Sequence, residues 1–315
     1  MRTCKYLLTG EIVDFRLQNK DILASDARSH IASRLGLPVS LVDIVCISVY
    51  DKGILDDEAP LPEDCHIGVV VSEDRCEEEL VHAIYPHAIK AYCFKDLRHL
   101  KCLILNGCLL GTRISTLPKR ICEFRRCRKI VICDCELWSI PPTIGKMSSL
   151  HELEIKNTYL HKLPDSVGNL FVLRHLDLSN NFLEDLPESM GKLLRLKLLD
   201  LSSNPLPPAL PDWVGSMKNL IVLRLSHTRL HTLSSTLVTL YCLEELCLND
   251  NYLTHLPEKI SGLEVLHSLF IARNKLRELP KDFGKLPALK LLDATGNCPR
   301  WSTLCLPPSL KELRL

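Results

Sequence analysis

Four cysteines lie within one short stretch of the chain, and cysteine thiolates are common zinc ligands. They are Cys122, Cys127, Cys133 and Cys135. Structural zinc sites usually take ligands as pairs separated by two residues, with a second pair further along the chain. Here four, five and one residues separate successive cysteines. The repeat described below directs Cys127 and Cys135 toward the core and Cys133 outward, so we expect no metal site.

His175 and Asp177 are a second group that could do chemistry, because an imidazole beside a carboxylate can transfer protons. Such a pair needs an enclosed pocket, and the open surface predicted below offers none. The sequence also lacks the phosphate-binding-loop, nucleophile-elbow and zinc-protease motifs. We therefore expect no catalytic residues and no cofactor. A remaining alternative is an enzyme fragment whose catalytic part follows Leu315.

A repeat organises most of the chain and is clearest between Leu173 and Arg195. Leucines recur there with the spacing L-x-x-L-x-L-x-x-N-x-L-x-x-L-P, and Leu196 restarts the pattern 23 residues after Leu173. The first leucine position of each unit falls at Leu100, Cys127, Leu150, Leu173, Leu196, Leu220, Leu243, Leu266, Leu289 and Leu310. Self-similarity at this period predicts a solenoid, in which the L-x-L segment is a short strand and neighbouring coils share one core.

The asparagine position of the repeat is expected to turn the chain and to bond backbone groups of neighbouring coils. It is occupied by Asn181, Asn204, Asn251, Asn274 and Asn297, and elsewhere by Cys108, Cys135, Thr158 and Thr228. Thiols and hydroxyls form fewer or weaker hydrogen bonds than an amide. We therefore expect looser turns in the coils that lack asparagine.

Alternate residues of each strand point away from the core, and in a solenoid of this kind they line its concave side. Acidic and apolar residues gather there over neighbouring coils. The candidate protein-binding residues are Glu152, Glu154, His175, Asp177, Leu198, Asp200, Val222, Arg224 and Phe270. Arginine and aromatic residues often dominate interface energetics, so Arg224 and Phe270 are the foremost candidates. The alternative is an ordinary solvated acidic face.

The leucine spacing, the asparagine and the recurring L-P pair resemble the 23-residue intracellular class of leucine-rich repeat proteins. This class includes Ras-suppressor-type, Scribble-type and plant Ras-group-related proteins. The resemblance implies an α/β fold, a curved horseshoe with parallel strands on its concave face, over residues 97–315 in nine to ten repeats. It also implies a non-enzymatic signalling adaptor whose protein partner is a small GTPase, a kinase or phosphatase, or a ubiquitin-pathway component.

Residues 1–72 lack the leucine repeat and predict a small α+β domain. Two strands are expected at Lys5–Leu8 and Ile12–Leu17, joined by a Thr9-Gly10 turn. A helix is expected near Ala27–Leu35, followed by further strands, the last of them at Ile67–Val71. The segments KYLLTGEIVDFRL, DARSHIASRLGLP, VCISVYDKGILDDEAPL and HIGVVV resemble a ubiquitin-like β-grasp domain. The sequence departs from that family after Val71, where Ser72-Glu73-Asp74 replaces a Gly-Gly tail. The resemblance therefore implies a docking module rather than a conjugated modifier.

The alternative for residues 1–72 is an unrelated α/β cap, and residues 73–96 are expected to form a linker and the cap of the first coil. Over 315 residues the net charge is only +1, which indicates neither nucleic-acid nor membrane binding. The fifteen cysteines occur partly at core positions, so we expect a reducing, cytoplasmic setting. No apolar run is long enough to span a membrane. We expect a monomeric adaptor, or alternatively a ubiquitin-pathway component that docks through its amino-terminal domain.

Overall fold

The structure is a computed structural model. The chain forms two compact units in it, Met1–Arg98 and His99–Leu315. It describes residues 2–8, 11–17, 100–106, 115–297 and 306–315. Each unit is considered by itself.

The described residues of the first unit form one antiparallel hairpin. Strand β1 (Arg2–Leu8) pairs with β2 (Glu11–Leu17), and Leu8 lies opposite Glu11 next to the turn. The sequence predicts this hairpin from its two apolar runs and the Thr-Gly pair between them. The other elements expected of a β-grasp domain, and the expected cap at 73–96, lie outside the described residues.

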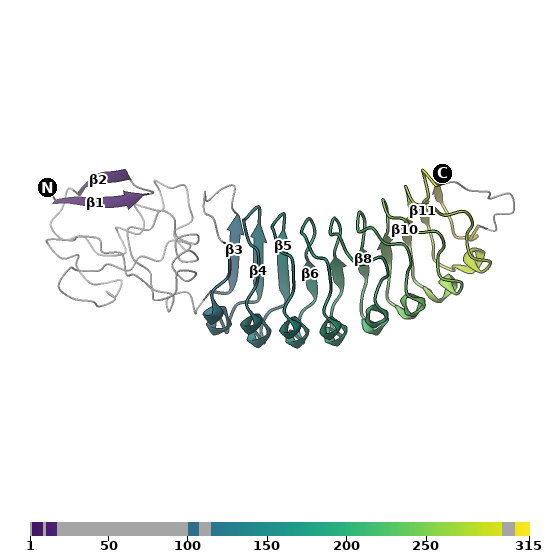
Figure 1. Ribbon diagram of the computed structural model, residues 1–315, viewed down its shortest axis with the longest axis horizontal. Helices are drawn as coiled ribbons and strands as arrows, with labels where there is room; N and C mark the ends of the chain where they lie inside the picture. The colour runs from purple at the N-terminus through teal and green to yellow at the C-terminus, as the bar shows by residue number, and fades with distance from the viewer. Residues whose placement is uncertain (1, 9–10, 18–99, 107–114, 298–305) are drawn as a thin grey trace. The chain divides into compact units, whose positions relative to one another are not determined.

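Parallel strands in sequence order form one sheet in the second unit (Figure 1). They are β3 (Cys102–Asn106), β4 (Lys129–Cys133), β5 (Glu152–Lys156), β6 (His175–Asp177), β7 (Leu198–Asp200), β8 (Val222–Arg224), β9 (Glu245–Cys247), β10 (Ser268–Phe270), β11 (Leu291–Asp293) and β12 (Glu312–Arg314). From β6 to β11 the central leucine of each three-residue strand is buried because the side chains alternate between core and surface, and Leu176, for example, lies opposite Leu199. The predicted solenoid sheet is confirmed.

Short 3-10 helices run along the side of the coils away from the strands (Figure 1). They are η3 (Lys119–Glu123), η4 (Pro142–Lys146), η5 (Asp165–Asn169), η6 (Glu188–Lys192), η7 (Asp212–Ser216), η8 (Ser235–Thr239), η9 (Ile260–Gly262) and η10 (Phe283–Lys285). A proline precedes the first turn in most of them, and its fixed φ suits that position. Ser234 replaces proline before η8, where its hydroxyl accepts a hydrogen bond from the Thr236 amide at 3.0 Å. None of the described helices could cross a membrane.

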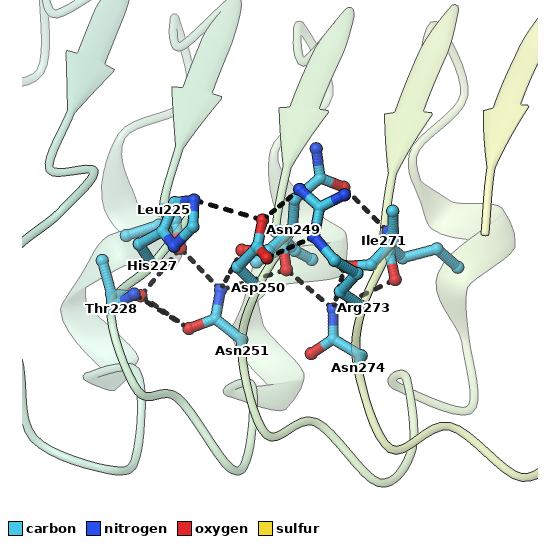
Figure 2. Close-up of polar contacts among 11 residues, drawn as sticks. Leu225, His227, Thr228, Asn249, Asp250, Asn251, Ile271, Arg273 and Asn274 are labelled. Atoms are coloured by element: carbon cyan, nitrogen blue, oxygen red, sulfur yellow. Dashed lines mark hydrogen bonds and ion pairs between the residues drawn. The ribbon is translucent and has the colours of Figure 1, made fainter. Parts of the chain in front are cut away.

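Where the turn position is an asparagine, its side chain joins the coil to the one before it. The Asn251 amide group donates to the carbonyl oxygens of Leu248 (3.0 Å) and Leu225 (2.7 Å), the second of which belongs to the preceding coil. Its side-chain oxygen accepts from the Leu230 amide of that preceding coil at 2.9 Å. Asn274 repeats the arrangement one coil later (Figure 2). These bonds satisfy backbone groups that the turn would otherwise leave buried and unpaired.

The residue before each of these turn positions has a left-handed backbone. Seven coils in the described part place a non-glycine residue there and one places Gly296: the residues are Asp134, Asn157, Asn180, Ser203, His227, Asp250, Arg273 and Gly296. Some of their side chains meet across coils. Figure 2 shows Asp250 between His227 and Arg273, with the His227 Nε2 atom 3.2 Å from one carboxylate oxygen and the Arg273 guanidinium bound to both oxygens.

Candidate functional site

The nine candidate residues lie on the outward side of the sheet, here called the strand face, in two rows of cross-strand neighbours. Glu152, His175, Leu198 and Val222 follow one another in the first row, and Glu154, Asp177, Asp200 and Arg224 in the second. Phe270 continues the second row beyond Cys247. The 24-residue step between Leu196 and Leu220 leaves this register intact, because the extra residue falls outside the strands.

An ion-pair ladder covers the β4–β6 part of the strand face, and we define it as Lys129, Glu152, Glu154, Lys156 and Asp177. The Lys129 ammonium lies 2.8 Å from a Glu152 oxygen and 3.0 Å from a Glu154 oxygen. The Lys156 ammonium lies 2.8 Å from the other Glu154 oxygen and 3.4 Å from Asp177. The candidate acidic patch therefore carries its own cations.

The hydrogen bonds of the ladder change the pKa values of its members. Bonds to Glu152 and Glu154 raise the pKa of Lys129, and the bond to Glu154 is the main cause of the raised pKa of Lys156. Burial alone would raise the pKa of Glu154, but the bonds from Lys156 and Lys129 outweigh burial and lower it. At neutral pH all three groups are therefore fully charged.

Sequence reasoning did not include Lys129 and Lys156 among the site residues. Lys129 stands in the first row directly before Glu152. Lys156 occupies a third outward position, at the end of the longer strand β5, opposite Cys133. A count of charges across neighbouring strands, rather than of acids alone, would have found both.

Asp200 points from the strand face but is only 8% exposed. Its carboxylate accepts a hydrogen bond at 2.9 Å from the amide of Ser202, two residues later in the chain. Burial raises the pKa of Asp200, and the hydrogen bonds from Ser202 together with the Arg224 guanidinium at 3.8 Å offset only part of that effect. Asp177 makes the equivalent bond to the Ser179 amide at 3.1 Å. Both aspartates therefore also hold the turn that follows their strand.

Arg224 links the acidic part of the strand face to a more apolar part. Its guanidinium donates to Glu245 at 2.9 Å. Beside it, Leu198 and Val222 are cross-strand neighbours, and Cys247 separates Arg224 from Phe270. Burial raises the pKa of Cys247 to about 12, so its side chain is an uncharged thiol. Between β7 and β10 the strand face is thus partly buried, and its apolar residues Leu198, Val222, Cys247 and Phe270 alternate with polar or charged ones.

The four clustered cysteines do not converge. Cys127 and Cys135 are buried in the core, as their repeat positions predict, while Cys122 and Cys133 are partly exposed. Burial raises the pKa of Cys127 to about 11, which favours a protonated, non-ligating thiol. Within the described ranges, no group of three His, Cys, Asp or Glu side chains is placed to hold a metal ion.

The exposed surface also carries aromatic rings that the sequence reasoning did not single out. Trp138, Tyr159, His161 and Phe182 stack on one another across three successive coils. They lie just after the turn positions Cys135, Thr158 and Asn181, in the segments that leave the strand face. Exposed and buried residues alternate in these segments. An alignment of the repeats with one another would therefore have placed these aromatic residues at matching exposed positions.

Two regions of the chain match known sequence-family models. Residues 161–251 match a model described as a leucine-rich repeat region, and residues 242–298 match one described as leucine rich repeat. A comparison with curated protein sequences gives no significant match.

Solved structures with the same architecture include a leucine-rich repeat protein of Leptospira interrogans, with 32% identity and a TM-score of 0.61 over 65% of this chain and 52% of that one. TLR13 in complex with ssRNA13 is 26% identical over 70% of this chain and 33% of that one, with a TM-score of 0.60. The plant peptide hormone receptor RGFR1 in complex with RGF2 is 22% identical over 64% of this chain and 37% of that one, with a TM-score of 0.51. This chain thus spans about half of the Leptospira protein.

Proposed function

We propose that this chain, a leucine-rich repeat protein, is a non-enzymatic adaptor that binds another protein on its strand face. One observation carries the proposal: the register of the strands gathers Leu198, Val222, Arg224 and Phe270 beside the ion-pair ladder on a single open surface. Solenoids commonly use such an extended face for binding. The RGFR1 structure with RGF2 and the TLR13 structure with ssRNA13 also come from complexes.

The charge of the strand face favours a basic protein segment over nucleic acid. From β4 to β9 it carries Lys129, Lys156 and Arg224 against Glu152, Glu154, Asp177, Asp200 and Glu245, which gives 3 − 5 = −2. A net negative surface repels phosphate groups and attracts lysine or arginine side chains. The paired cations limit this attraction, so the apolar side chains of Leu198, Val222 and Phe270 supply the anchor.

Arg224 and Phe270 are the residues that we expect to contribute most to binding. Both are only partly exposed and are therefore held in place before the partner arrives. Truncation of a central aromatic or arginine side chain typically costs about 2 kcal/mol or more of binding free energy. The contacts of the surrounding charged residues mainly select the partner and exclude water.

The test is affinity purification of partners with the full chain, followed by quantitative mass spectrometry. Phe270→Ala is expected to reduce recovery of the main partner at least about tenfold, since about 1.4 kcal/mol is one decade in affinity. The matched control is Phe171→Ala, because Phe171 lies outside the strand face and is 58% exposed. Equal losses in both variants, or no loss in Phe270→Ala, would exclude the strand face as the binding site.

A second candidate function is a ubiquitin-pathway adaptor that docks through a ubiquitin-like domain. The observation in its favour is the β1–β2 hairpin, which is the element with which a β-grasp fold begins. Deletion of residues 1–72 is expected to remove ubiquitin receptors, ligases or the proteasome from the recovered partners while leaving the strand-face partner. If the deletion leaves these proteins in the recovered set, this candidate is wrong.

The first proposal places the protein in the cytoplasm as a monomer that acts in signalling. A small GTPase, a kinase or a phosphatase is the class of partner that fits it. Size-exclusion chromatography with light scattering and fluorescence microscopy of the full chain test the oligomeric state and the location.

A further inference from the structure

The inference concerns the aromatic ladder, which we define as the side chains of Trp138, Tyr159, His161 and Phe182. Trp138 stacks on Tyr159 with ring centroids 5.0 Å apart and on His161 at 5.6 Å. Phe182 stacks on Tyr159 at 5.8 Å and on His161 at 5.6 Å. The interplanar angles range from 6° to 17°, so the four rings form one nearly parallel array.

The ladder is open to solvent although its rings are large. Trp138 is 51% exposed, Phe182 47% and Tyr159 43%. A contiguous apolar patch of this kind on a soluble protein commonly marks an interaction surface. The rings already hold one another in a fixed geometry, so a partner would lose little side-chain entropy by ordering them. The patch therefore has the exposure and the rigidity of an interface anchor.

The same solenoid shows which group covers an aromatic ring in this position of the repeat. Phe182 and Tyr252 both directly follow the turn asparagine of their coils. The next coil places Lys275 over the Tyr252 ring, with the ammonium 4.6 Å from the centroid. The next coil after Phe182 has Pro205 in the position of Lys275, so it supplies no cation there. The cation that completes the arrangement at Tyr252 has no counterpart at Phe182.

Acidic side chains border the ladder. Glu136 precedes Trp138 by two residues and Glu184 follows Phe182 by two, and each is exposed on the same face as its neighbouring ring because the leucine between them is buried. Among the residues that the structure describes, Glu184 has no ion-pair partner closer than 4.0 Å. Carboxylates beside exposed aromatic side chains favour an incoming cation and oppose the phosphates of a nucleic acid.

We propose that the aromatic ladder, with Glu184 at its edge, binds an arginine side chain presented by an extended segment of a partner protein. Arginine suits the site better than lysine, because its planar guanidinium can stack on a ring and bond a carboxylate at the same time. The surface is separate from the part of the strand face between β7 and β10. The inference therefore goes beyond the proposed adaptor site and assigns a second contact, on coils β4–β6.

The test uses the full chain and a random library of twelve-residue peptides displayed on phage, selected for binding to the wild-type protein and against Phe182→Ala. Arginine is expected to be enriched over lysine in the selected peptides. Their affinity is expected to fall at least about tenfold for Phe182→Ala and for Glu184→Lys. Phe171→Ala, which alters a phenylalanine outside the ladder that is 58% exposed against 47% for Phe182, is expected to change affinity less than about twofold.

Further measurements separate this inference from the adaptor proposal and from the alternative ligand. Phe270→Ala, on the strand face, is expected to leave peptide affinity unchanged. Circular dichroism confirms that Phe182→Ala folds, and Glu184→Lys tests the same surface without removing a ring. Selected peptides without arginine, equal binding to Phe182→Ala and wild type, or displacement of the peptides by a single-stranded oligonucleotide would each overturn the inference. None of those results would bear on binding at Phe270.

Discussion

The Thr228 hydroxyl lies 3.0 Å from the side-chain oxygen of Asn251, the residue that holds the same turn position one coil later. The Thr228 amide also donates to that oxygen, at 3.1 Å. A second acceptor, the Leu225 carbonyl oxygen, lies 2.7 Å from the hydroxyl, so its single proton can serve one of the two at a time. The coil with threonine is therefore tied to its neighbour mainly by the neighbour's asparagine.

Asn251→Ala is expected to lower the free energy of unfolding by about 2–4 kcal/mol, because several buried backbone groups lose a hydrogen-bond partner at about 1–3 kcal/mol each. Thr228→Ala removes one shared hydroxyl bond and is expected to cost about 1 kcal/mol. Urea denaturation of both variants measures the difference. Equal losses would mean that the asparagine does not bridge the coils more strongly than the threonine does.

Glu154→Gln is expected to destabilise the solenoid at pH 7, because it removes the ion pairs with Lys129 and Lys156. The loss is expected to be only about 0.5–1 kcal/mol, since solvent screens these partly exposed pairs. The pKa of Glu154 is lowered in the folded protein, so its contribution is complete above the unfolded value of about 4.3. It is lost as the pH falls through the folded pKa. Urea midpoints of variant and wild type are therefore expected to converge at acidic pH.

Glu264→Gln is the matched control for this pH dependence. Glu264 is exposed and has no ion pair within the described ranges. Its replacement is expected to shift the urea midpoint little and by the same amount at every pH. A pH-independent loss in Glu154→Gln would show that packing, rather than the ladder's charges, causes the effect.

The fold of the described solenoid residues, 100–106, 115–297 and 306–315, was predictable because one physical rule repeats along the chain. A coil cannot bury its own leucines, so the period alone requires stacking, and Leu153, Leu176 and Leu199 align as the spacing predicts. The residue three positions after the L-P proline, such as Val167 or Met190, is buried for the same reason. The β1–β2 hairpin is likewise confirmed, whereas the rest of the predicted β-grasp domain stays a prediction.

The candidate site was predictable only in its register. The sequence places Glu154, Asp177 and Asp200 in one row, but it does not state which cations reach them or that Asp200 accepts a hydrogen bond from the Ser202 amide. Those outcomes depend on side-chain rotamers and on contacts between neighbouring coils. The stacking of Trp138 on His161 was missed for the same reason, since the two rings are distant in sequence and adjacent only across coils.

Asp200→Asn is expected to raise the melting temperature at pH 7. Burial raises the pKa of Asp200 above its ordinary value, so the charged form is disfavoured in the folded protein. An amide removes that charge and keeps an oxygen to accept the Ser202 bond. A carboxyl group with a raised pKa disfavours folding above its folded pKa, so the gain is expected to shrink as the pH falls through that pKa toward the unfolded value of about 3.9.

Differential scanning calorimetry across pH checks this expectation, with Asp177→Asn as the comparison. Asp177 also accepts a turn hydrogen bond but lies 3.4 Å from the Lys156 ammonium, so its replacement removes an ion pair and is expected to lower the melting temperature. A lower melting temperature for Asp200→Asn at pH 7 would mean that attraction to Arg224 outweighs the cost of burial.

Gly168→Ala is expected to destabilise the solenoid by about 1–3 kcal/mol through overpacking between coils. Gly168 lies in η5, and a Cβ atom there would lie 2.2 Å from the backbone oxygen of Ser189 in η6. Backbone cannot move aside as a flexible side chain can, and the Ser189 hydroxyl bond to the Asp165 carbonyl oxygen at 2.6 Å holds the two helices together. Relief therefore requires the coils to separate.

Gly191→Ala provides the control for Gly168→Ala, because it makes the same chemical change one coil later with more space. Its Cβ atom would lie 3.0 Å from the Trp213 Cβ and 3.2 Å from the Ser216 hydroxyl, where small shifts suffice. We expect urea denaturation to give a loss at least about twice as large for Gly168→Ala. Equal losses would show that helix spacing along the solenoid adjusts freely, and the close approach of η5 and η6 would then not be a constraint on the fold.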